Sequence, residues 1–183
     1  CYLHNLVKLA IPANVLEKSG KLSDEEYNMI KRHTFYTYRI LESVEGLDEI
    51  NSWASFHHER LDGKGYPFGH EGDDLSLGSR IVAVADVFTA LTENRPYRQG
   101  MKKKKVINIL DSMAKNGALD PNIVSLLKCN YDKVNKLRSA AQNNAGKEYE
   151  EFEKKTSLRR EERKSYQKQV DNTSAHKLQD VSP

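Results

Sequence analysis

A carboxylate in the middle of an almost wholly apolar segment constrains this chain more than any other feature. Asp86 stands inside the run Ile81–Leu91, IVAVADVFTAL, which is apolar nearly all round and predicts a buried helix. A carboxylate without a partner is very costly in such surroundings. We therefore expect Asp86 to pair with a cation, to cap a helix or to coordinate a metal ion, and this run alone does not choose among these three.

The rest of the chain predicts helices separated by one long loop. Apolar residues recur at helical spacing in most segments, and the Ser23-Asp24-Glu25-Glu26 capping box begins one of them. The predicted helices span residues 3–11, 23–44, 47–60, 81–91, 103–115 and 121–140. There is no internal repeat and no alternating pattern typical of strands, so the predicted fold class is all-α, a helical bundle.

Two segments depart from this helical pattern. The connection from Asp62 to Gly78 is rich in Gly and acidic residues, and a loop of this length inside a domain is usually functional or disordered. Residues 148–168 alternate charge densely, which predicts a solvated helix, with a coiled coil or a domain connection as the alternative. We divide the chain into a domain over 1–142 and a charged helical segment with a disordered tail over 143–183.

Composition excludes several classes of protein. No apolar run approaches the roughly 20 residues of a membrane span, and no signal peptide opens the chain. The two cysteines, Cys1 and Cys129, provide neither a disulfide framework nor a thiolate metal site, which favours a cytoplasmic location. A net charge of +3 gives no reason to expect a nucleic acid polymer as partner.

Four histidines join Asp86 as candidate metal ligands. Each lies on or beside an apolar face of a predicted helix, where a single histidine is more often an ordinary core residue. Taken together, ligands from separate helices of one bundle suit Fe, Mn or another divalent ion that prefers nitrogen and oxygen. The histidines are His4, His33, His57 and His58.

Cationic side chains accompany this group. Lys8 lies one helical turn after His4, and Arg95 and Arg98 follow the Asp86 helix in the segment ENRPYR. Guanidinium groups beside a metal site indicate an anionic substrate, with phosphate as the leading case. Ordinary surface charge is the alternative for each of these residues.

Several segments of the chain resemble the HD-GYP phosphodiesterase family. The segment HHERLDGKGYP, residues 57–67, resembles the family signature HHExxDGxGYP. The upstream segment LHNLVKLAIP, residues 3–12, resembles LHDxGKxxIP, and residues 79–98 resemble the block that carries the next metal-ligating Asp. Weaker matches lie over 21–33 and 119–121, so the resemblance covers about residues 2–130.

The resemblance implies an HD-domain helical bundle that hydrolyses cyclic di-GMP with a bi- or trinuclear Fe or Mn centre. It places Lys8 and Asp86 in catalysis, with Lys8, Arg95 and Arg98 on the phosphates. It places Tyr66 and Pro67 in the nucleotide pocket. The implied ligand positions are His4, Asn5, His33, His57, His58 and Asp86. It further implies an upstream receiver or sensory domain, as in a response regulator, and a possible partner with a GGDEF domain.

The chain departs from the family pattern at the metal shell. Asn5 stands where the family has the Asp of its HD pair, Val7 replaces a Gly, and Thr89 replaces a further Asp. Because Cys1 opens the chain with a helix already begun, we expect upstream sequence, including a further ligand helix, to be missing. Three functions stay open: hydrolysis of cyclic di-GMP, a degenerate module that binds without hydrolysis, and hydrolysis of another phosphorylated nucleotide. Gly65-Tyr66-Pro67 disfavours the third.

Overall fold

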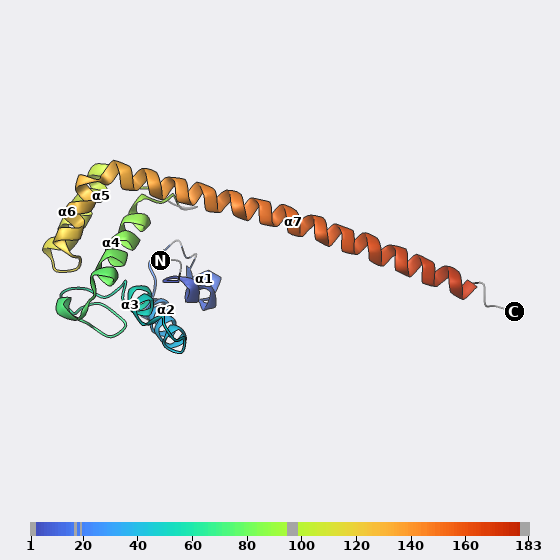
Figure 1. Cartoon of the computed structure of the whole chain (residues 1–183), viewed down its shortest axis with the longest axis horizontal. Coiled ribbons are helices and arrows are strands. Elements are labelled where there is room, and N and C mark those ends of the chain that lie inside the picture. Colours follow the sequence, from blue (N-terminus) through green and yellow to red (C-terminus); the bar gives the residue numbers. More distant parts are fainter. Residues whose placement is uncertain (1–2, 17, 19, 95–98, 180–183) are drawn as a thin grey trace. The chain divides into compact units, whose positions relative to one another are not determined.

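The computed structural model describes residues 3–16, 18, 20–94 and 99–179, and in this part of the chain helices are the main secondary structure (Figure 1). Only one isolated bridge, between Asp62 and Glu71, has β-type pairing among the described residues. The prediction of an all-α fold is thereby confirmed. The chain divides into two compact units, Cys1–Asp132 and Lys133–Pro183. The predicted boundary after residue 142 stays a prediction.

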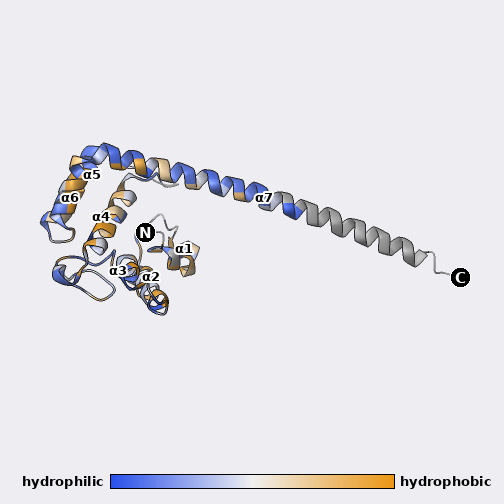
Figure 2. Ribbon diagram, viewed as in Figure 1, coloured by the Kyte–Doolittle hydropathy of each residue, from blue (hydrophilic) through white to orange (hydrophobic). Residues whose placement is uncertain are grey.

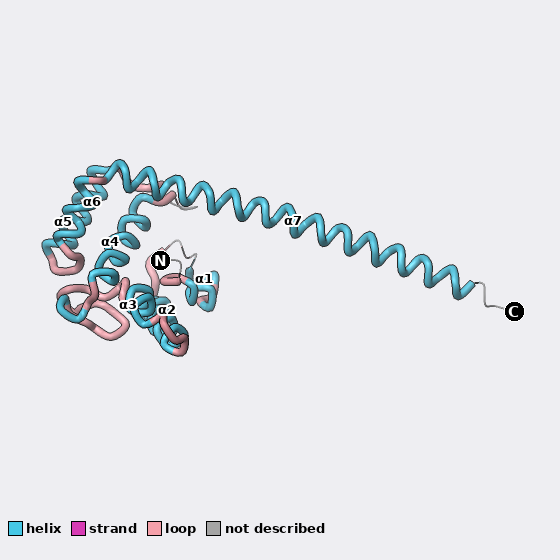
Figure 3. Tube along the Cα trace, in the orientation of Figure 1, coloured by secondary structure: helices cyan, strands magenta, loops and turns pink. Residues whose placement is uncertain are grey.

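The helices of the first unit follow one another with short connections, apart from the long loop between α3 and α4 (Figure 3). They are η1 (Leu6–Ala10), α1 (Ala13–Leu16), α2 (Asp24–Glu42), α3 (Asp48–Ser55), η2 (Gly72–Asp74), α4 (Leu77–Thr92), α5 (Lys103–Lys115) and α6 (Pro121–Cys129). The last helix, α7 (Tyr131–Gln179), begins in this unit and makes up most of the second.

Helix α2 begins where the capping box predicts. The Ser23 hydroxyl accepts the backbone N–H of Glu26 at 3.2 Å, and the Glu26 carboxylate accepts the N–H of Ser23 at 2.7 Å. One face of α2 is buried through His33, Thr34, Thr37 and Leu41. Tyr27, in the first turn of the helix, and Val44, two residues beyond its end, are each 45% exposed, although the spacing places them on the same face. The buried face of α2 therefore runs from His33 to Leu41.

Helix α4 is the central helix of the first unit and contacts α3, α5 and α6. Figure 2 shows apolar residues along it. The Ser76 hydroxyl caps its start by accepting the N–H of Ser79. At Gly78, a β-carbon would lie 2.1 Å from Trp53 Nε1, so glycine permits the close approach of α4 to α3. Asp86 therefore sits on a helix that is packed against its neighbours on several sides.

Several predicted helix bounds are wrong. Helix α4 begins at Leu77, four residues before its predicted start. Residues 3–5 form a turn ahead of the short 3₁₀ helix η1 and are not part of a helix. Helix α3 ends at Ser55 rather than at Arg60, where the Phe56 N–H closes onto the Ser52 carbonyl. The segment 121–140 is broken at Asn130, whose side chain donates to the Leu126 carbonyl at 2.9 Å and so competes with the helical hydrogen bonds.

The long loop is fixed near its start. The Arg60 guanidinium forms a bidentate ion pair with Asp62 at 2.8 and 2.7 Å, and the Asp62 N–H donates to the Gly117 carbonyl, just after α5, at 2.9 Å. Within the predicted loop, Gly72–Asp74 forms the 3₁₀ helix η2. The loop is therefore an ordered part of the first unit.

The second unit is a single charged helix. Its described side chains are almost all exposed, including the large side chains of Leu137, Tyr149 and Phe152. Helix α7 continues to Gln179, where the sequence predicts disorder, because no Gly or Pro interrupts residues 147–179. No helix among the described residues combines the length and the apolar character that crossing a bilayer requires.

Candidate metal centre

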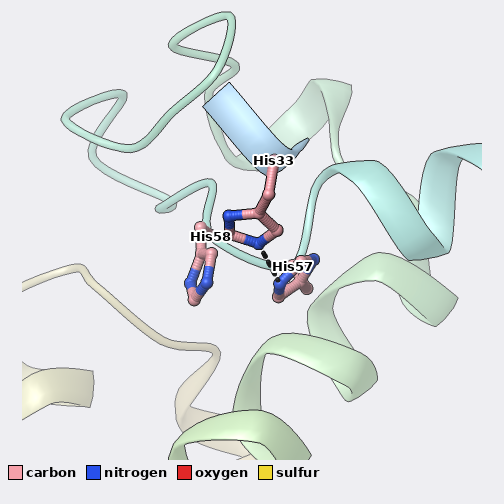
Figure 4. A group of neighbouring side chains, drawn as sticks. All are labelled: His33, His57 and His58. Atoms are coloured by element: carbon pink, nitrogen blue, oxygen red, sulfur yellow. Dashed lines mark hydrogen bonds between the residues drawn. The ribbon is translucent and has the colours of Figure 1, made fainter. Parts of the chain in front are cut away.

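Three histidines converge where α2 meets the turn that follows α3. His33 lies on α2, while His57 and His58 lie in that turn, and one nitrogen of each ring lies within 4.8 Å of the others. Figure 4 shows His33 reaching from α2 toward the two rings of the turn. His33 and His57 are buried, at 1% and 2% exposure. The predicted convergence of these three residues is thus observed, although His57 and His58 come from a turn and not from a helix.

The orientation of two of these rings is set by backbone carbonyls. His33 Nδ1 lies 2.6 Å from the Ile30 carbonyl, and His57 Nδ1 lies 2.7 Å from the Ala54 carbonyl. A carbonyl only accepts, so both Nδ1 atoms carry hydrogen and both Nε2 atoms of the neutral rings are left with lone pairs. These two Nε2 atoms face each other at 3.5 Å. Two facing lone pairs favour a cation between them. A hydrogen bond from the other ring nitrogen to a carbonyl is also how proteins commonly orient histidine ligands of a metal ion.

His4 and Asp86 extend the cluster on one side. His4 lies in the turn before η1, its ring centroid is 4.9 Å from that of His57, and its Nε2 is 3.4 Å from Asp86 Oδ1. The side chain that the structure places next to Asp86 is therefore that of a histidine, His4. Burial raises the pKa of Asp86, but hydrogen bonding with His4, the attraction of His58 and His57 when they are protonated at low pH, and the charge of Lys8 outweigh it and hold that pKa below its ordinary value.

His33, His57 and His58 are neutral at physiological pH. Burial lowers the pKa of His33 and of His58 to about 4, and it lowers the pKa of His57 further, with the charges of His58 and His4 adding to the effect. A neutral imidazole can donate its lone pair to a metal ion, whereas a protonated one cannot. The cluster is therefore ready to bind a divalent ion without first losing protons.

The same pKa shifts predict how the metal-free protein responds to acid. A histidine with a lowered pKa stabilises the fold fully above its unfolded value of about 6.5, and this contribution is lost as the pH falls toward 4. For His33 alone the loss is about 3 kcal/mol. Chemical denaturation of chelator-treated protein from pH 7 to pH 4.5 should show this decline, and His33→Gln should reduce it. A free energy of unfolding that stays constant over this range would contradict the prediction.

Asn5 brings an amide into the cluster. Its Nδ2 lies 2.8 Å from His4 Nε2, and its Oδ1 is buried without a hydrogen-bond partner. His4 Nε2 cannot accept a hydrogen bond from Asn5 and donate one to Asp86 at the same time. Whether Nε2 carries a proton therefore decides which of the two hydrogen bonds forms. Imidazoles, a carboxylate and an amide oxygen are the kinds of donor that fit a divalent ion preferring nitrogen and oxygen ligands. Unlike a carboxylate, the amide oxygen of Asn5 carries no negative charge.

The loop segment Gly65-Tyr66-Pro67 is packed directly against the histidine turn. The Tyr66 N–H donates to the His58 carbonyl at 3.2 Å, and the Tyr66 ring lies 4.9 Å from the His58 ring. The peptide bond between Tyr66 and Pro67 is cis. Lys8 lies in η1, close enough for its charge to affect the pKa values of His33, His58 and Asp86. The predicted phosphate-binding residues Arg95 and Arg98 lie outside the described residues.

Two contributions to this site do not follow from the sequence patterns considered above. The carboxylate of Glu59, 3% exposed, accepts the N–H groups of Phe68 at 2.7 Å and of Gly69 at 3.1 Å, and so shapes the loop. In the sequence, the one indication of a role for Glu59 is its position directly after the candidate ligands His57 and His58. Lys31 on α2 lies over the rings of Tyr27 and Tyr66. Its spacing of four residues from Tyr27 predicts only the first of these contacts.

Comparison with known proteins agrees with this arrangement. The family model described as HD domain matches residues 1–123. The chain is 41% identical over 138 residues to 3'3'-cGAMP-specific phosphodiesterase 1 of Vibrio cholerae, a match that covers 75% of this chain and 32% of the relative. It is 41% identical over 128 residues to the cyclic di-GMP phosphodiesterase response regulator RpfG of Xanthomonas campestris pv. campestris, covering 68% of this chain and 33% of that relative.

A third relative is the cyclic di-GMP phosphodiesterase PA4108 of Pseudomonas aeruginosa, 37% identical over 122 residues, which are 66% of this chain and 29% of the relative. The chain thus spans about a third of the length of the curated relatives it matches. All three matches agree with the resemblance carried by residues 57–67. The chain therefore belongs to the HD domain family, in the HD-GYP branch that its Gly65-Tyr66-Pro67 segment indicates.

Proposed function

We propose that this chain hydrolyses a phosphodiester bond of a guanine-containing cyclic dinucleotide, cyclic di-GMP in the first place, in a reaction that depends on a divalent metal ion. The observation that carries the proposal is the pair of Nε2 atoms of His33 and His57, which face each other at 3.5 Å beside His58. The names of the relatives support the substrate class, because cyclic di-GMP and 3'3'-cGAMP both contain guanine and both are joined by phosphodiesters.

The proposed metal ligands are the residues gathered in the cluster. They are His4, His33, His57, His58 and Asp86, together with Oδ1 of Asn5. Iron or manganese in a bi- or trinuclear centre is the metal we propose, because imidazole, carboxylate and amide ligands suit these ions. A divalent ion supplies positive charge to a phosphodiester and lowers the pKa of water.

The remaining residues bind and orient the substrate in this proposal. The Lys8 ammonium, which already acts on the electrostatics of the cluster, neutralises a phosphate oxygen. Asp86 carries a full negative charge at neutral pH because its pKa is low, so it can bind a metal cation without first losing a proton. Tyr66 and Pro67 line the nucleotide pocket, and Arg95 and Arg98 hold the phosphates.

The test is hydrolysis of cyclic di-GMP by the purified chain with Fe(II) or Mn(II) under anaerobic conditions. We expect a linear dinucleotide or GMP as product, and no product after treatment with a chelator. His57→Ala removes a nitrogen that faces His33 and should lower both metal content and turnover at least about a hundredfold. His70→Ala serves as the matched control, because the ring contacts of His70 are with Phe56 and Phe68. Metal-independent hydrolysis would contradict the proposal.

One observation favours a second candidate, a module that binds the nucleotide without hydrolysing it. The Asn5 amide lies 2.8 Å from His4 Nε2, where a carboxylate would add negative charge to the site. Binding of cyclic di-GMP without any metal-dependent product would support this candidate. The upstream receiver or sensory domain, the partner with a GGDEF domain and the cytoplasmic location stay predictions, the last resting on the small number of cysteines.

A further inference from the structure

A lysine ammonium lies over two tyrosine rings next to the histidine cluster. Lys31 Nζ is 4.6 Å from the centroid of the Tyr27 ring and 5.8 Å from that of the Tyr66 ring. The two rings meet edge to face, with centroids 6.4 Å apart. In the part of the chain that the structure describes, Lys31 forms no ion pair with a carboxylate. The ammonium thus keeps hydrogen-bonding capacity that these aromatic contacts do not use.

This group of three side chains is tied to the histidines from two directions. Tyr27 and Lys31 lie one turn apart on α2, the helix that also carries His33. The Tyr66 ring lies against the His58 ring, with centroids 4.9 Å apart and planes inclined by 33°. A molecule held by Lys31 and the two rings is therefore held at a defined place beside the cluster. Since Tyr27 is 45% exposed, its ring can be reached from solvent.

The hydrogen-bonding chemistry of Lys31 matches the edge of guanine better than that of adenine. Aromatic rings provide faces on which any base can stack. A lysine ammonium has three hydrogen-bond donors and no acceptor. Guanine presents two acceptors on one edge, N7 and O6, whereas adenine presents N7 and the donor N6 amino group there. An ammonium in this position therefore binds guanine and meets a donor when adenine takes its place.

We propose that Tyr27, Lys31 and Tyr66 form a guanine-selective subsite, with Lys31 as its specificity-determining residue. The inference rests on the proposed function in one respect, since the base belongs to a cyclic dinucleotide whose phosphate reaches the histidine cluster. In the absence of such a subsite, Lys31 and Tyr27 would be an ordinary cation–π pair on a helix surface.

The experiment compares the affinity of the full chain for two hydrolysis-resistant probes, the phosphorothioate analogues of cyclic di-GMP and cyclic di-AMP, by calorimetry with Mn(II) present. We expect the wild-type chain to prefer the guanine analogue by about tenfold or more. Lys31→Gln should remove most of this preference, because an amide can donate to adenine N7 and accept from N6. Lys31→Met should weaken binding of the guanine analogue without improving binding of the adenine analogue. Lys104→Gln, on the exposed side of α5, is the matched control and should change neither affinity.

Each outcome separates this subsite from the proposed function. If the chain hydrolyses cyclic di-GMP but Lys31→Gln leaves the ratio of the two affinities unchanged, the subsite is wrong and the proposed function stands. If the chain hydrolyses nothing but the ratio falls in Lys31→Gln, the subsite stands and the proposed function is wrong. A wild-type chain that binds both analogues equally, or binds neither, overturns the subsite.

Discussion

Asn5→Asp is expected to raise the affinity of the cluster for Fe(II) or Mn(II) by at least about tenfold. The ligand set proposed here has one negatively charged member, Asp86, and the substitution adds a second beside His4. A carboxylate also gives two oxygens in place of the single unpartnered Oδ1 of Asn5. Elemental analysis of anaerobically purified protein, together with a titration of the metal-free chain, measures the change directly.

Metal content in the wild-type chain decides how this result is interpreted. Two or more ions per chain with Asn5 in place would mean that the site tolerates the amide, which strengthens the proposed hydrolysis. Little metal in the wild type, with recovery in Asn5→Asp, would favour the module that binds without hydrolysis. Asn28→Asp is the control for the added charge, because Asn28 is exposed on α2 and should leave metal content unchanged. Equal affinities of wild type and Asn5→Asp would show that Asn5 lies outside the metal shell.

Gly65→Ala is expected to destabilise the first unit by about 3 kcal/mol. A β-carbon at Gly65 would lie 2.4 Å from the backbone nitrogen of Arg60 and from Cα of Glu59. Both atoms belong to the backbone that directly follows His57 and His58, so neither can move aside as a flexible side chain would. The loop must shift away from the histidine turn, and the hydrogen bond between the Tyr66 N–H and the His58 carbonyl is then lost.

Chemical denaturation of the two proteins measures this loss, and Gly20→Ala provides the matched control. No atom lies within 4 Å of the position that a β-carbon at Gly20 would take, so that substitution should leave the free energy of unfolding nearly unchanged. Because Tyr66 moves with the loop, Gly65→Ala should also weaken binding of cyclic di-GMP more than it lowers metal content. A variant as stable as the wild type would mean that the contact between loop and histidine turn is looser than described.

Much of the helical framework could be predicted because its signals are local. The capping box at Ser23 and Glu26 starts α2 through hydrogen bonds between residues three apart, and the predicted bounds of 103–115 are those of α5. The predictions were wrong where a distant contact or a competing side chain intervened. Apolar residues continue at helical spacing past Ser55, yet helix α3 ends there. The chain that follows is held elsewhere, since the Asp62 N–H donates to the Gly117 carbonyl.

The candidate site divides in the same way. The sequence alone contains the candidate ligands, the signature segment of residues 57–67 and the substitution at Asn5. These features are enough to assign the family. The contact of Lys31 with Tyr66 joins residues from α2 and from the loop, and no spacing rule links them. The role of Glu59 in holding the N–H groups of Phe68 and Gly69 likewise depends on how the loop folds back.

The sequence by itself determined that this chain is helical and that it belongs to the HD domain family, and it indicated the histidines and Asp86 as candidate metal ligands, because caps, periodicity and a charge among apolar neighbours are properties of neighbouring residues. Only the tertiary structure decided which nitrogens face one another. The carbonyls of Ile30 and Ala54 fix the rings of His33 and His57, and packing brings their Nε2 atoms to 3.5 Å. Such geometry depends on where separate segments meet in space, which local residue patterns do not encode.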